Sequence, residues 1–296
     1  MSLNLHLLRL FVTVARLGNF SRAAEVLHIS QPAVSRGVRE FEDQVGNRLL
    51  ERNSSGAVPT EAGLILLRHA AALFAAERAA EEDLAALRGL TSGSLVIGAS
   101  TTVSTWFLPP LLGRFHQDHP AVRLQLRTAN TLLVAELLLA REVDVAIVEG
   151  PIDQPGIVVR PWREDHMVWI AAPSHHLARQ PTPVPVARLA DELIIVREPG
   201  SGTRDVGHSA LADHGVQPKE ILEVGSTETI RQLVAAGMGL ALVSQAAIRA
   251  ELSLGTLVIL EIEHFTLSRT LSLLSLPGRQ PTAAAAAFEQ LLDRAE

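Results

Sequence analysis

The stretch from residue 20 to residue 50 constrains this chain most, because its spacing predicts two short helices joined by a tight turn. In the second helix, residues 30–46, apolar side chains recur at helical spacing and form one buried stripe: Val34, Val38, Phe41 and Val45. Ser30 can cap this helix, and Pro32 falls in its first turn, where no intrahelical donor is lost. The preceding helix, from about Ser21, packs through Ala23, Ala24 and Leu27. The pattern predicts a helix-turn-helix.

The face of the second helix opposite the apolar stripe carries side chains that can bond phosphates and base edges: Gln31, Ser35, Arg36 and Arg39. We therefore expect this helix to read DNA. The alternative is an ordinary amphipathic helix pair that binds nothing. The segment that follows, LLERNSSGAVPTEAG, predicts a hairpin, and Arg52 beside it suits a wing lying along the DNA backbone.

The distribution of charge agrees with DNA binding at the N-terminal end. The whole chain has a net charge of −6, yet residues 1–60 hold seven arginines and five acidic residues. This small basic excess is the electrostatic footprint expected of a DNA-binding segment. Because it is small, we expect binding to need a dimer or tetramer.

Composition describes a globular protein with ample core, since 47% of the 296 residues are hydrophobic and 20% are charged. The length suits two or three domains. No apolar run approaches the roughly 18–20 residues of a membrane span. The N-terminus lacks a basic leader and a cleavage site, so we expect a structural helix there. The chain has no cysteine, which excludes disulfides and thiolate metal sites. We expect a cytoplasmic protein.

Residues 61–90 predict one long helix, with Thr60 as its cap and Glu61 in its first turn. Two apolar stripes run along it. One holds Leu64, Leu67, Ala71 and Phe74, and the other holds Leu66, Ala70, Leu73, Glu77, Ala80, Leu84 and Leu87. One small domain cannot cover both stripes, so we expect a second copy of the chain as partner. A solvated connector is the alternative. Glu77 interrupts its stripe and is a candidate for setting register.

Beyond residue 90, strands alternate with helices, which predicts parallel, doubly wound sheets. The chain is expected to leave one α/β lobe near Trp162 and to return to it near Phe265. This gives four parts: a DNA-binding domain 1–60, a linker helix 61–90, lobe I from 91–163 and 266–296, and lobe II from 164–265. Two lobes joined by two crossovers have a cleft between them, where α/β folds bind small ligands.

Hydroxyl and cationic side chains cluster where predicted strands meet helices, and free amides there favour anions. The candidates are Ser100, Thr101, Thr102, Thr128, Asn130, Ser201, Thr203, Arg204, Ser226 and Thr227. Helix capping alone would also explain them. The Gly-rich turn REPGSGTR lacks the lysine of a nucleotide P-loop, so phosphate hydrolysis is not indicated. We expect a small anionic ligand. Glu149 would repel an anion unless Arg204 or another cation compensates, or it would bind an amino group, and both alternatives stay open.

Metal binding and catalysis find little support in the sequence. His116 and His119 have helical spacing but lack a third ligand nearby, and His175 and His176 are expected to face opposite ways on the surface. We expect no metal and no cofactor. No nucleophile–base arrangement or paired catalytic carboxylates stand out, so an enzyme is not expected.

The assembled parts resemble a LysR-type transcriptional regulator over the full length. The resemblance is carried by FSRAAEVLHISQPAVSRGVREFEDQVGNRLLERNSSGAVPTEAG and, downstream, by REPGSGTR and AAGMGLALVS. Two positions depart from the family pattern: Leu50 stands where an aromatic is usual, and Pro59 replaces the leucine before the threonine. The REPGSGTR form of this motif resembles the form found in regulators of carbon fixation and sulfur metabolism.

The resemblance implies an α+β multidomain fold, with an N-terminal winged helix-turn-helix, a linker helix and a two-lobed periplasmic-binding-protein-like effector domain. It implies a dimer or tetramer on double-stranded promoter DNA and a small-molecule effector in the cleft, which the loop of Ser100 would line. Residues matching the family's DNA-contact segment are Gln31, Pro32, Ser35 and Arg36, with Arg52 in the wing. Together with Ser30 and Arg39 they are the expected DNA contacts. A solute-binding protein with an unrelated helical domain is the alternative function.

Overall fold

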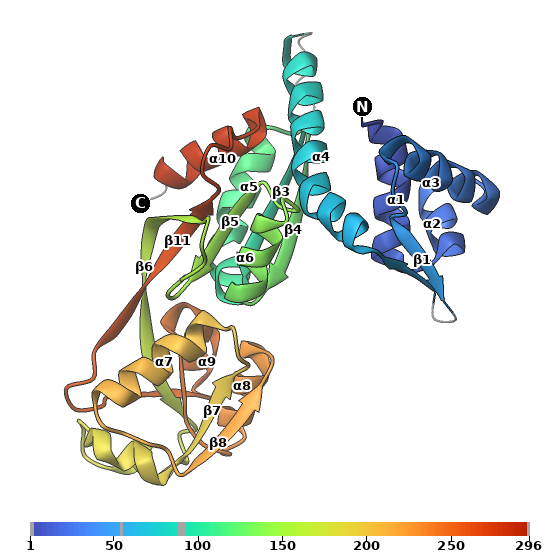
Figure 1. Ribbon diagram of the computed structural model, residues 1–296. Coiled ribbons are helices and arrows are strands. Elements are labelled where there is room, and N and C mark those ends of the chain that lie inside the picture. The colour runs from blue at the N-terminus through green and yellow to red at the C-terminus, as the bar shows by residue number, and fades with distance from the viewer. Residues whose placement is uncertain (1–2, 54–55, 88–92, 295–296) are drawn as a thin grey trace. The chain divides into compact units, whose positions relative to one another are not determined.

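The computed structural model describes residues 3–53, 56–87 and 93–294 of the chain (Figure 1). Contacts divide the chain into two compact units, Met1–Glu81 and Glu82–Glu296. Within the part of the chain that the structure describes, every helix is too short or too polar to cross a membrane.

The first unit begins with three helices that form the predicted helix-turn-helix. These are α1 (Leu5–Leu17), α2 (Phe20–Leu27) and α3 (Gln31–Val45). Gly18 ends α1 in the left-handed conformation, with φ of 62°, which glycine adopts without a steric penalty. The Asn19 side chain then caps α2, and the Ser30 hydroxyl caps α3 by accepting from the amide of Ala33.

A two-stranded hairpin completes this unit and packs beside the helices. Strands β1 (Leu50–Asn53) and β2 (Gly56–Pro59) pair antiparallel, as predicted for the wing. The Glu42 carboxylate on α3 accepts hydrogen bonds from the amides of Leu49, at 2.8 Å, and Leu50, at 3.1 Å. It therefore ties α3 to the start of the hairpin. The core is continuous across the three helices, and the rings of Phe11 and Phe41 lie 6.2 Å apart within it.

The long helix α4 (Glu61–Leu87) follows, and Thr60 caps it by accepting from the amide of Gly63 at 3.1 Å. Its early apolar residues pack on the core of the first unit: Ala62, Leu66, Leu67, Ala70, Leu73 and Phe74. Glu77 forms an ion pair at 2.6 Å with Arg9 of α1, in its own chain. Leu64, Ile65 and Leu84 are exposed in this chain.

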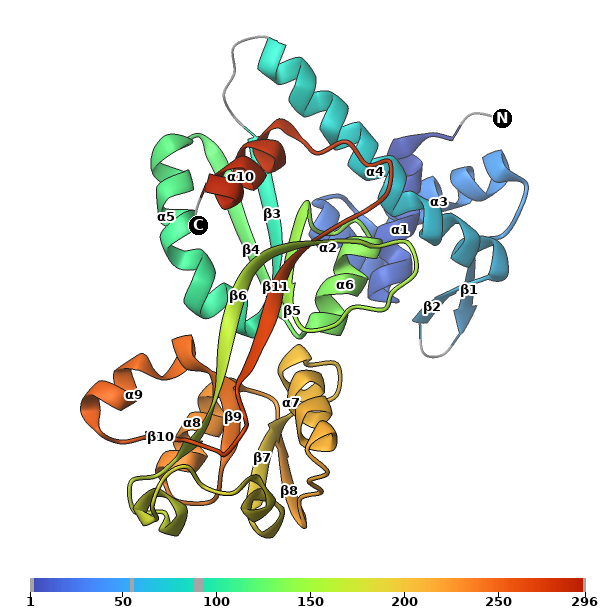
Figure 2. The ribbon, with the colours of Figure 1, turned by 90° about the vertical axis from the view of Figure 1, so that its left-hand side faces the viewer.

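The second unit has two lobes. The first lobe contains β3 (Gly93–Ser100), α5 (Leu108–Asp118), β4 (Val122–Ala129), α6 (Thr131–Leu139), β5 (Val145–Glu149) and α10 (Ala283–Arg294). A π-helical turn, Val103–Phe107, leads into α5. Alternate residues of the strands face opposite cores, so α6 covers one face of the sheet while α5 and α10 cover the other (Figure 2).

The second lobe contains β7 (Leu193–Arg197), α7 (Gly202–Asp213), β8 (Glu220–Val224), α8 (Thr227–Ala235), β9 (Ala241–Ser244), α9 (Arg249–Leu254) and β10 (Val258–Leu260). Short 3₁₀ turns at His176–Arg179, Val186–Asp191 and Gln245–Ile248 join these elements. Residues from α7 and α8 enter separate hydrophobic cores of this lobe, one containing Leu211 and the other containing Ile230 and Val234.

Two long strands cross between the lobes side by side, as Figure 2 shows. They are β6 (Val158–Ala171) and β11 (Leu267–Ser275), which pair antiparallel from Leu267 opposite Met167 to Ser275 opposite Val158. The segments VVRPW and HMVWIAA, expected as separate pieces, are thus one strand. The crossovers expected near Trp162 and Phe265 lie within β6 and immediately before β11.

The prediction of purely parallel sheets was wrong in part. Strands β3, β4 and β5 are parallel, and so are β7 and β8, as expected. The remaining pairings of the large sheet, whose order is β10-β6-β11-β5-β3-β4 with β9 on β6, are antiparallel. The reason is the double crossover: one strand leaves the first lobe and the other returns, so the two must run in opposite directions where they pair.

Candidate DNA-binding face and effector cleft

The exposed face of α3 carries most of the predicted DNA-contact residues. Pro32, Arg36 and Arg39 are exposed, Ser30 is exposed at the cap, and Gln31 is half-buried. Residues three apart on a helix are neighbours, so Arg36 and Arg39 present two guanidinium groups on one side of α3. A capped helix with an apolar stripe inward and two arginines outward is suited to enter a DNA groove.

Ser35 departs from the prediction that it belongs to this exposed face, since only 8% of the residue is accessible. It lies one turn from Val38, at the edge of the buried stripe, where packing against the rest of the unit covers it. It borders a hollow that is also lined by Phe20, Arg39, Arg48 and Leu50. Arg52 lies in β1 opposite Ala57, and its side chain is outside the described residues.

In the second unit, buried polar groups gather where parallel strands of the first lobe end. Ser100 ends β3 and Glu149 ends β5, and both are almost inaccessible to solvent. The Ser100 hydroxyl donates to the Glu149 carboxylate and also accepts from the amide of Val103. Thr102 is buried beside them, whereas Thr101 is half-buried. The predicted strand-to-helix junction therefore forms a polar site.

Arg269, on the crossing strand β11, joins this site to the second lobe. Its Nε donates to Asp165 at 2.8 Å, and its terminal nitrogens donate to Thr203 at 2.7 Å and Thr102 at 3.3 Å. Nη1 also lies 3.9 Å from a Glu149 oxygen. Thr102 belongs to the first lobe and Thr203 to the second. One buried guanidinium thus contacts both sides of the interface between the lobes.

Arg197, at the end of β7, forms a second buried cationic centre. It donates to Thr227 at 3.1 Å and holds the Glu198 carboxylate through two bonds of 2.7 and 2.9 Å. Partial burial alone would raise the pKa of Glu198, but the bonds and charge of Arg197, a backbone hydrogen bond and the bond from Asn130 together lower the pKa. Arg204 donates to the backbone oxygen of Arg197 and pairs with Glu223.

The charges of Arg269 and Arg197 compensate the negative charge of the Glu149 carboxylate. Burial raises the pKa of the Glu149 carboxyl, while the charge of Arg269, a hydrogen bond from Thr102 and the charge of Arg197 act in the opposite direction. The compensating groups are therefore Arg269 and Arg197, and Arg204 instead bonds Glu223. The raised pKa favours a protonated carboxyl, which weakens the repulsion that Glu149 would exert on an anion.

The two lobes approach closely at their backbones beside this polar site. A Cβ added at Gly202, the first residue of α7, would lie 1.9 Å from the backbone oxygen of Glu149. The amide of Leu132 donates to the oxygen of Gly200 at 3.1 Å, and the Asn130 side chain donates to Pro199 and Glu198 at 3.4 Å. Within the first lobe, Thr131 donates to the same Glu149 backbone oxygen at 2.9 Å. On this side the cleft is closed.

The other predicted effector residues occupy different surroundings. Thr227 is buried against Arg197, Ser201 is buried just before α7, and Ser226 caps α8 by accepting from Thr229. Thr128 was expected at a junction, but it lies within β4 and is exposed, because the strand runs on to Ala129. A groove of about 400 Å³ opens between the lobes, lined by Thr105, Trp106, Pro109, Pro110, Arg231, Arg249 and Glu251.

Sequence reasoning missed Arg269, Asp165, Arg197 and Thr131, which are all buried at the polar centre. The sequence holds only weak signs of two of these residues. Arg269 stands at the head of the otherwise largely apolar run TLSLLSL, and Arg197 opens the quoted motif REPGSGTR. A charged residue in a predicted core strand is a candidate for a buried pair.

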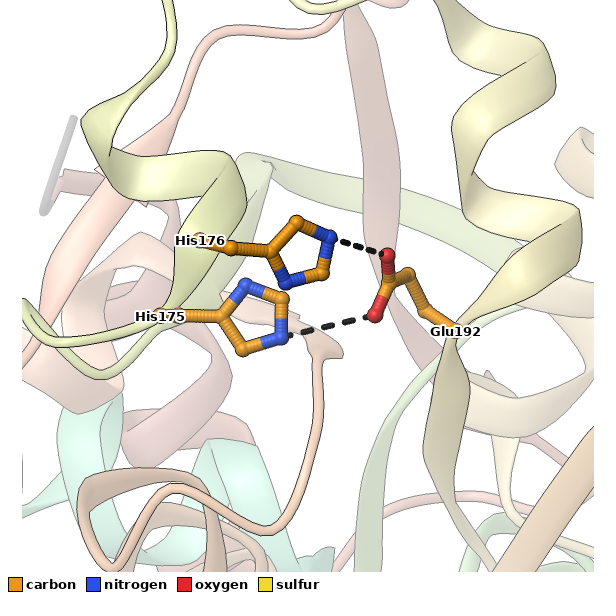
Figure 3. Close-up of side chains that lie close together, drawn as sticks. All are labelled: His175, His176 and Glu192. Carbon is orange, nitrogen blue, oxygen red and sulfur yellow. Dashed lines mark ion pairs between the residues drawn. The ribbon is translucent and has the colours of Figure 1, made fainter.

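The adjacent histidines also differ from expectation, since they were predicted to face opposite ways. Figure 3 shows both rings directed at Glu192. His175 caps a 3₁₀ turn that begins at His176, so the chain turns between the two residues, and their rings stack with centroids 4.6 Å apart. Burial lowers the pKa of His175, and Glu192 opposes that shift. His116 and His119 are exposed at the end of α5.

A winged helix-turn-helix, a long helix and a two-lobed domain with a buried polar centre define a ligand-responsive DNA-binding regulator. Residues 5–64 match the family described as "Bacterial regulatory helix-turn-helix protein, lysR family", and residues 88–296 match "LysR substrate binding domain". The chain belongs to the LysR family of transcriptional regulators.

Relatives of this chain include the RuBisCO operon transcriptional regulator of Allochromatium vinosum, with 35% identity over 292 residues, covering 99% of this chain and 96% of the relative. The regulator CfxR of Cupriavidus necator is 37% identical, covering 90% of this chain and 84% of the relative. Relatives of this kind are transcriptional regulators, so the chain is a regulator and not an enzyme.

Solved structures agree. The CcmR regulatory domain of Synechocystis, solved in complex with 2-PG, has 32% identity and a TM-score of 0.64, covering 69% of this chain and 97% of that one. Full-length CbnR, solved with its target DNA, has 25% identity and a TM-score of 0.70, covering 99% and 100%. Of these two neighbours, the CcmR domain was thus solved with a small molecule and CbnR with DNA.

Proposed function

We propose that this regulator binds double-stranded promoter DNA in the cytoplasm as a homodimer or homotetramer, with α3 in the major groove and the hairpin along the backbone. The observation that carries the proposal is the outward pair Arg36 and Arg39 on a helix capped at Ser30. The CbnR–DNA complex supports it. The remaining proposed contacts are Gln31, Pro32, Ser35 and Arg52.

An Arg36→Ala variant tests the assignment of α3. Target sites are first selected from a random DNA pool with the full-length protein, and affinity is then measured at several salt concentrations. We expect Arg36→Ala to lose about 1–3 kcal/mol of binding free energy, roughly 5- to 150-fold in affinity. The matched control is Arg123→Ala, an exposed arginine on β4.

The salt dependence separates two kinds of contact. If Arg36 bonds a base edge, its loss relaxes sequence preference at one position, whereas loss of a phosphate contact weakens all sequences alike and lowers the salt slope by about one. Equal affinities and preferences for the Arg36→Ala, Arg123→Ala and unmodified proteins would remove Arg36 from the interface.

For the effector domain, we infer that the ligand is a small anion held at the polar centre between the lobes. Arg269 supports this inference, because one buried guanidinium contacts hydroxyls of both lobes, at Thr102 and Thr203. Such a group holds an acidic ligand through charge-assisted hydrogen bonds. The remaining proposed effector contacts are Ser100, Thr101, Ser201, Thr227, Asn130, Arg204, Ser226 and Thr128.

An anion at this centre has to compete with carboxylates of the chain itself. Arg269 is bonded to Asp165, and Arg197 to Glu198. A ligand phosphate or carboxylate could take the place of the Glu149 carboxyl beside Ser100 and Arg269. Displacing Glu149 would change how closely the lobes meet at Gly202 and at the bond from Leu132 to Gly200. Ligand binding is thereby coupled to lobe closure.

Titration of the full-length chain with 2-PG, inorganic phosphate and sulfate tests the anion inference, with the midpoint of thermal unfolding as readout. At about 100 times its dissociation constant a ligand adds about 2.7 kcal/mol to stability. We expect saturable stabilisation that a Ser100→Ala/Thr203→Ala double variant loses, while DNA binding is retained. Ser253→Ala on α9 is the control. Equal responses of both variants would exclude this centre.

We further propose that the chain divides into a DNA-binding domain 1–60, a linker helix 61–90, lobe I from 91–163 with 266–296, and lobe II from 164–265.

A further inference from the structure

We propose that His175, His176 and Glu192 on the second lobe bind one divalent transition metal ion of the zinc class. The three residues offer two imidazole nitrogens and a carboxylate oxygen, all within 4.8 Å of one another. Zinc bonds to nitrogen and carboxylate oxygen are about 2.0–2.2 Å long, so atoms this close can share one ion after small side-chain rotations. Two histidines and one glutamate form a known zinc ligand set.

The geometry directs the donor atoms to one point. The Nε2 atom of His176 lies 2.9 Å from one oxygen of Glu192, and the Nε2 atom of His175 lies 3.5 Å from the other. Figure 3 shows the two rings side by side with these nitrogens on the same side, facing the carboxylate. The rings are inclined by only 31°. An ion placed between the rings and the carboxylate meets all three donors.

The backbone holds these donors at defined positions. His175 follows β6, and its amide donates to the oxygen of Ala172 at 3.0 Å. Glu192 immediately precedes β7. Its neighbour Asp191 pairs with Lys219, so that ammonium is already engaged with a carboxylate beside the site. Because both anchors adjoin strands of one lobe, the ligands need little reorganisation to bind an ion.

Burial leaves one side of the site open. The side chains of His175 and Glu192 are 9% and 11% accessible, whereas that of His176 is 54% accessible. An ion would therefore be anchored by two half-buried residues whose side chains are largely covered, and reached from solvent past the third. A fourth coordination position remains for water or for a group from another molecule.

Metal binding would change the tautomer of the His175 ring. Its Nδ1 accepts from the amide of Leu177 at 3.3 Å, which assigns the ring proton to Nε2. Coordination through Nε2 moves that proton to Nδ1, and the bond from Leu177 is lost. This bond is long, so it opposes coordination weakly. The tautomer change also supplies a signature that a surface ion pair would not show.

The test uses the full-length chain, free of any polyhistidine tag and stripped with a chelator. Zinc is titrated calorimetrically, and cobalt is added in parallel to follow the visible absorption of a tetrahedral site. We expect one ion per chain at this site and loss of affinity by at least about tenfold in His176→Ala and in Glu192→Gln, since even outer-shell changes cost 10–100-fold. His176 is exposed, so its removal leaves the core intact.

His116→Ala is the matched control, because His116 is an exposed histidine near His119 in the other lobe. It should bind zinc as the unmodified chain does. In nitrogen-detected NMR, zinc should convert His175 from the Nε2–H to the Nδ1–H tautomer. Absence of zinc binding, unchanged affinity in both site variants, or loss of binding in His116→Ala would each overturn the proposal.

Discussion

Arg269 is the residue that holds together the buried polar centre of Ser100, Thr102, Glu149, Asp165 and Thr203. It bonds Asp165 beside it on the crossing strands and hydroxyls of both lobes, and it lies near the Glu149 carboxyl. Removing a buried charge partner leaves the other charge uncompensated, which is strongly destabilising. Burial raises the pKa of the Glu149 carboxyl above its ordinary value, against the charge of Arg269.

Replacing Glu149 by glutamine should remove one pH-dependent contribution to stability. The pKa of Glu149 is raised in the folded chain above its ordinary value near 4.5, so the native state binds the proton more tightly than the unfolded state. Its contribution is complete below that ordinary value and is lost as pH rises through the folded pKa. Each tenfold difference in proton affinity corresponds to about 1.4 kcal/mol. Denaturant unfolding from pH 4 to pH 8 measures the effect.

The informative quantity is the difference in unfolding free energy between the unmodified chain and Glu149→Gln, since other titrating groups cancel in it. We expect this difference to move in favour of the glutamine variant as pH rises. Glu263→Gln, at an exposed position, is the control. A difference that stays constant over the whole range would show that Glu149 does not titrate there.

At the scale of elements, the start of α7 controls how closely the lobes approach. Gly202 faces the end of β5 across the interface, and Gly150 adopts φ of 83° on the other side, so two glycines allow backbone to meet backbone. Any side chain at position 202 would overlap the Glu149 backbone. That contact is made of main-chain atoms, which cannot rotate away as a side chain can.

Gly202→Ala should therefore push the lobes apart at this point. We expect a loss of about 1–3 kcal/mol in unfolding free energy, typical of overpacking, and an altered anion response. The control is Gly207→Ala on the same helix, where the nearest contact of the added carbon is Leu242 at 3.4 Å. That change should be neutral or stabilising by up to about 1 kcal/mol.

The stability of both glycine variants is measured by thermal unfolding, and their anion response by a dose–response curve. If Gly202→Ala unfolds and responds as Gly207→Ala does, the close approach of the lobes has no role in stability or signalling.

At the scale of the whole molecule, α4 carries several exposed apolar side chains. Its early residues pack on the first unit, but Leu64 and Ile65 remain exposed, and Leu84 is 57% accessible. Glu77, expected to set register between chains, pairs with Arg9 of its own chain. The exposed leucines are thus the better markers of a helix-to-helix contact between copies.

Leu84→Asp should weaken self-association. Burying a leucine contributes about 1.5–3 kcal/mol, so we expect the dissociation constant of the oligomer to rise by at least about tenfold. Sedimentation over a range of concentrations measures it. Leu254→Asp on α9, where the leucine is 76% accessible, is the matched control. Equal association of the two variants would place the oligomer interface away from Leu84.

The sequence alone determined the features that depend on neighbours along the chain. The caps at Ser30 and Thr60, the glycine that ends α1 and the apolar stripe of α3 are local, so spacing and residue type predict them. The hairpin and the alternation of strands and helices follow from the same short-range rules. The resemblance to the LysR family rested on these local segments, and the family is confirmed.

Only the tertiary structure decided which distant residues meet. Arg269 and Asp165 are separated by 104 positions, and Arg269 and Thr102 by 167, so no local pattern brings them together. The same holds for the turn of His175 and His176, whose shared partner is Glu192, and for Ser35, whose burial depends on the packing of other segments. Local sequence sets the elements, whereas the polar centre arises where two antiparallel crossing strands carry charged side chains into the interface between the lobes.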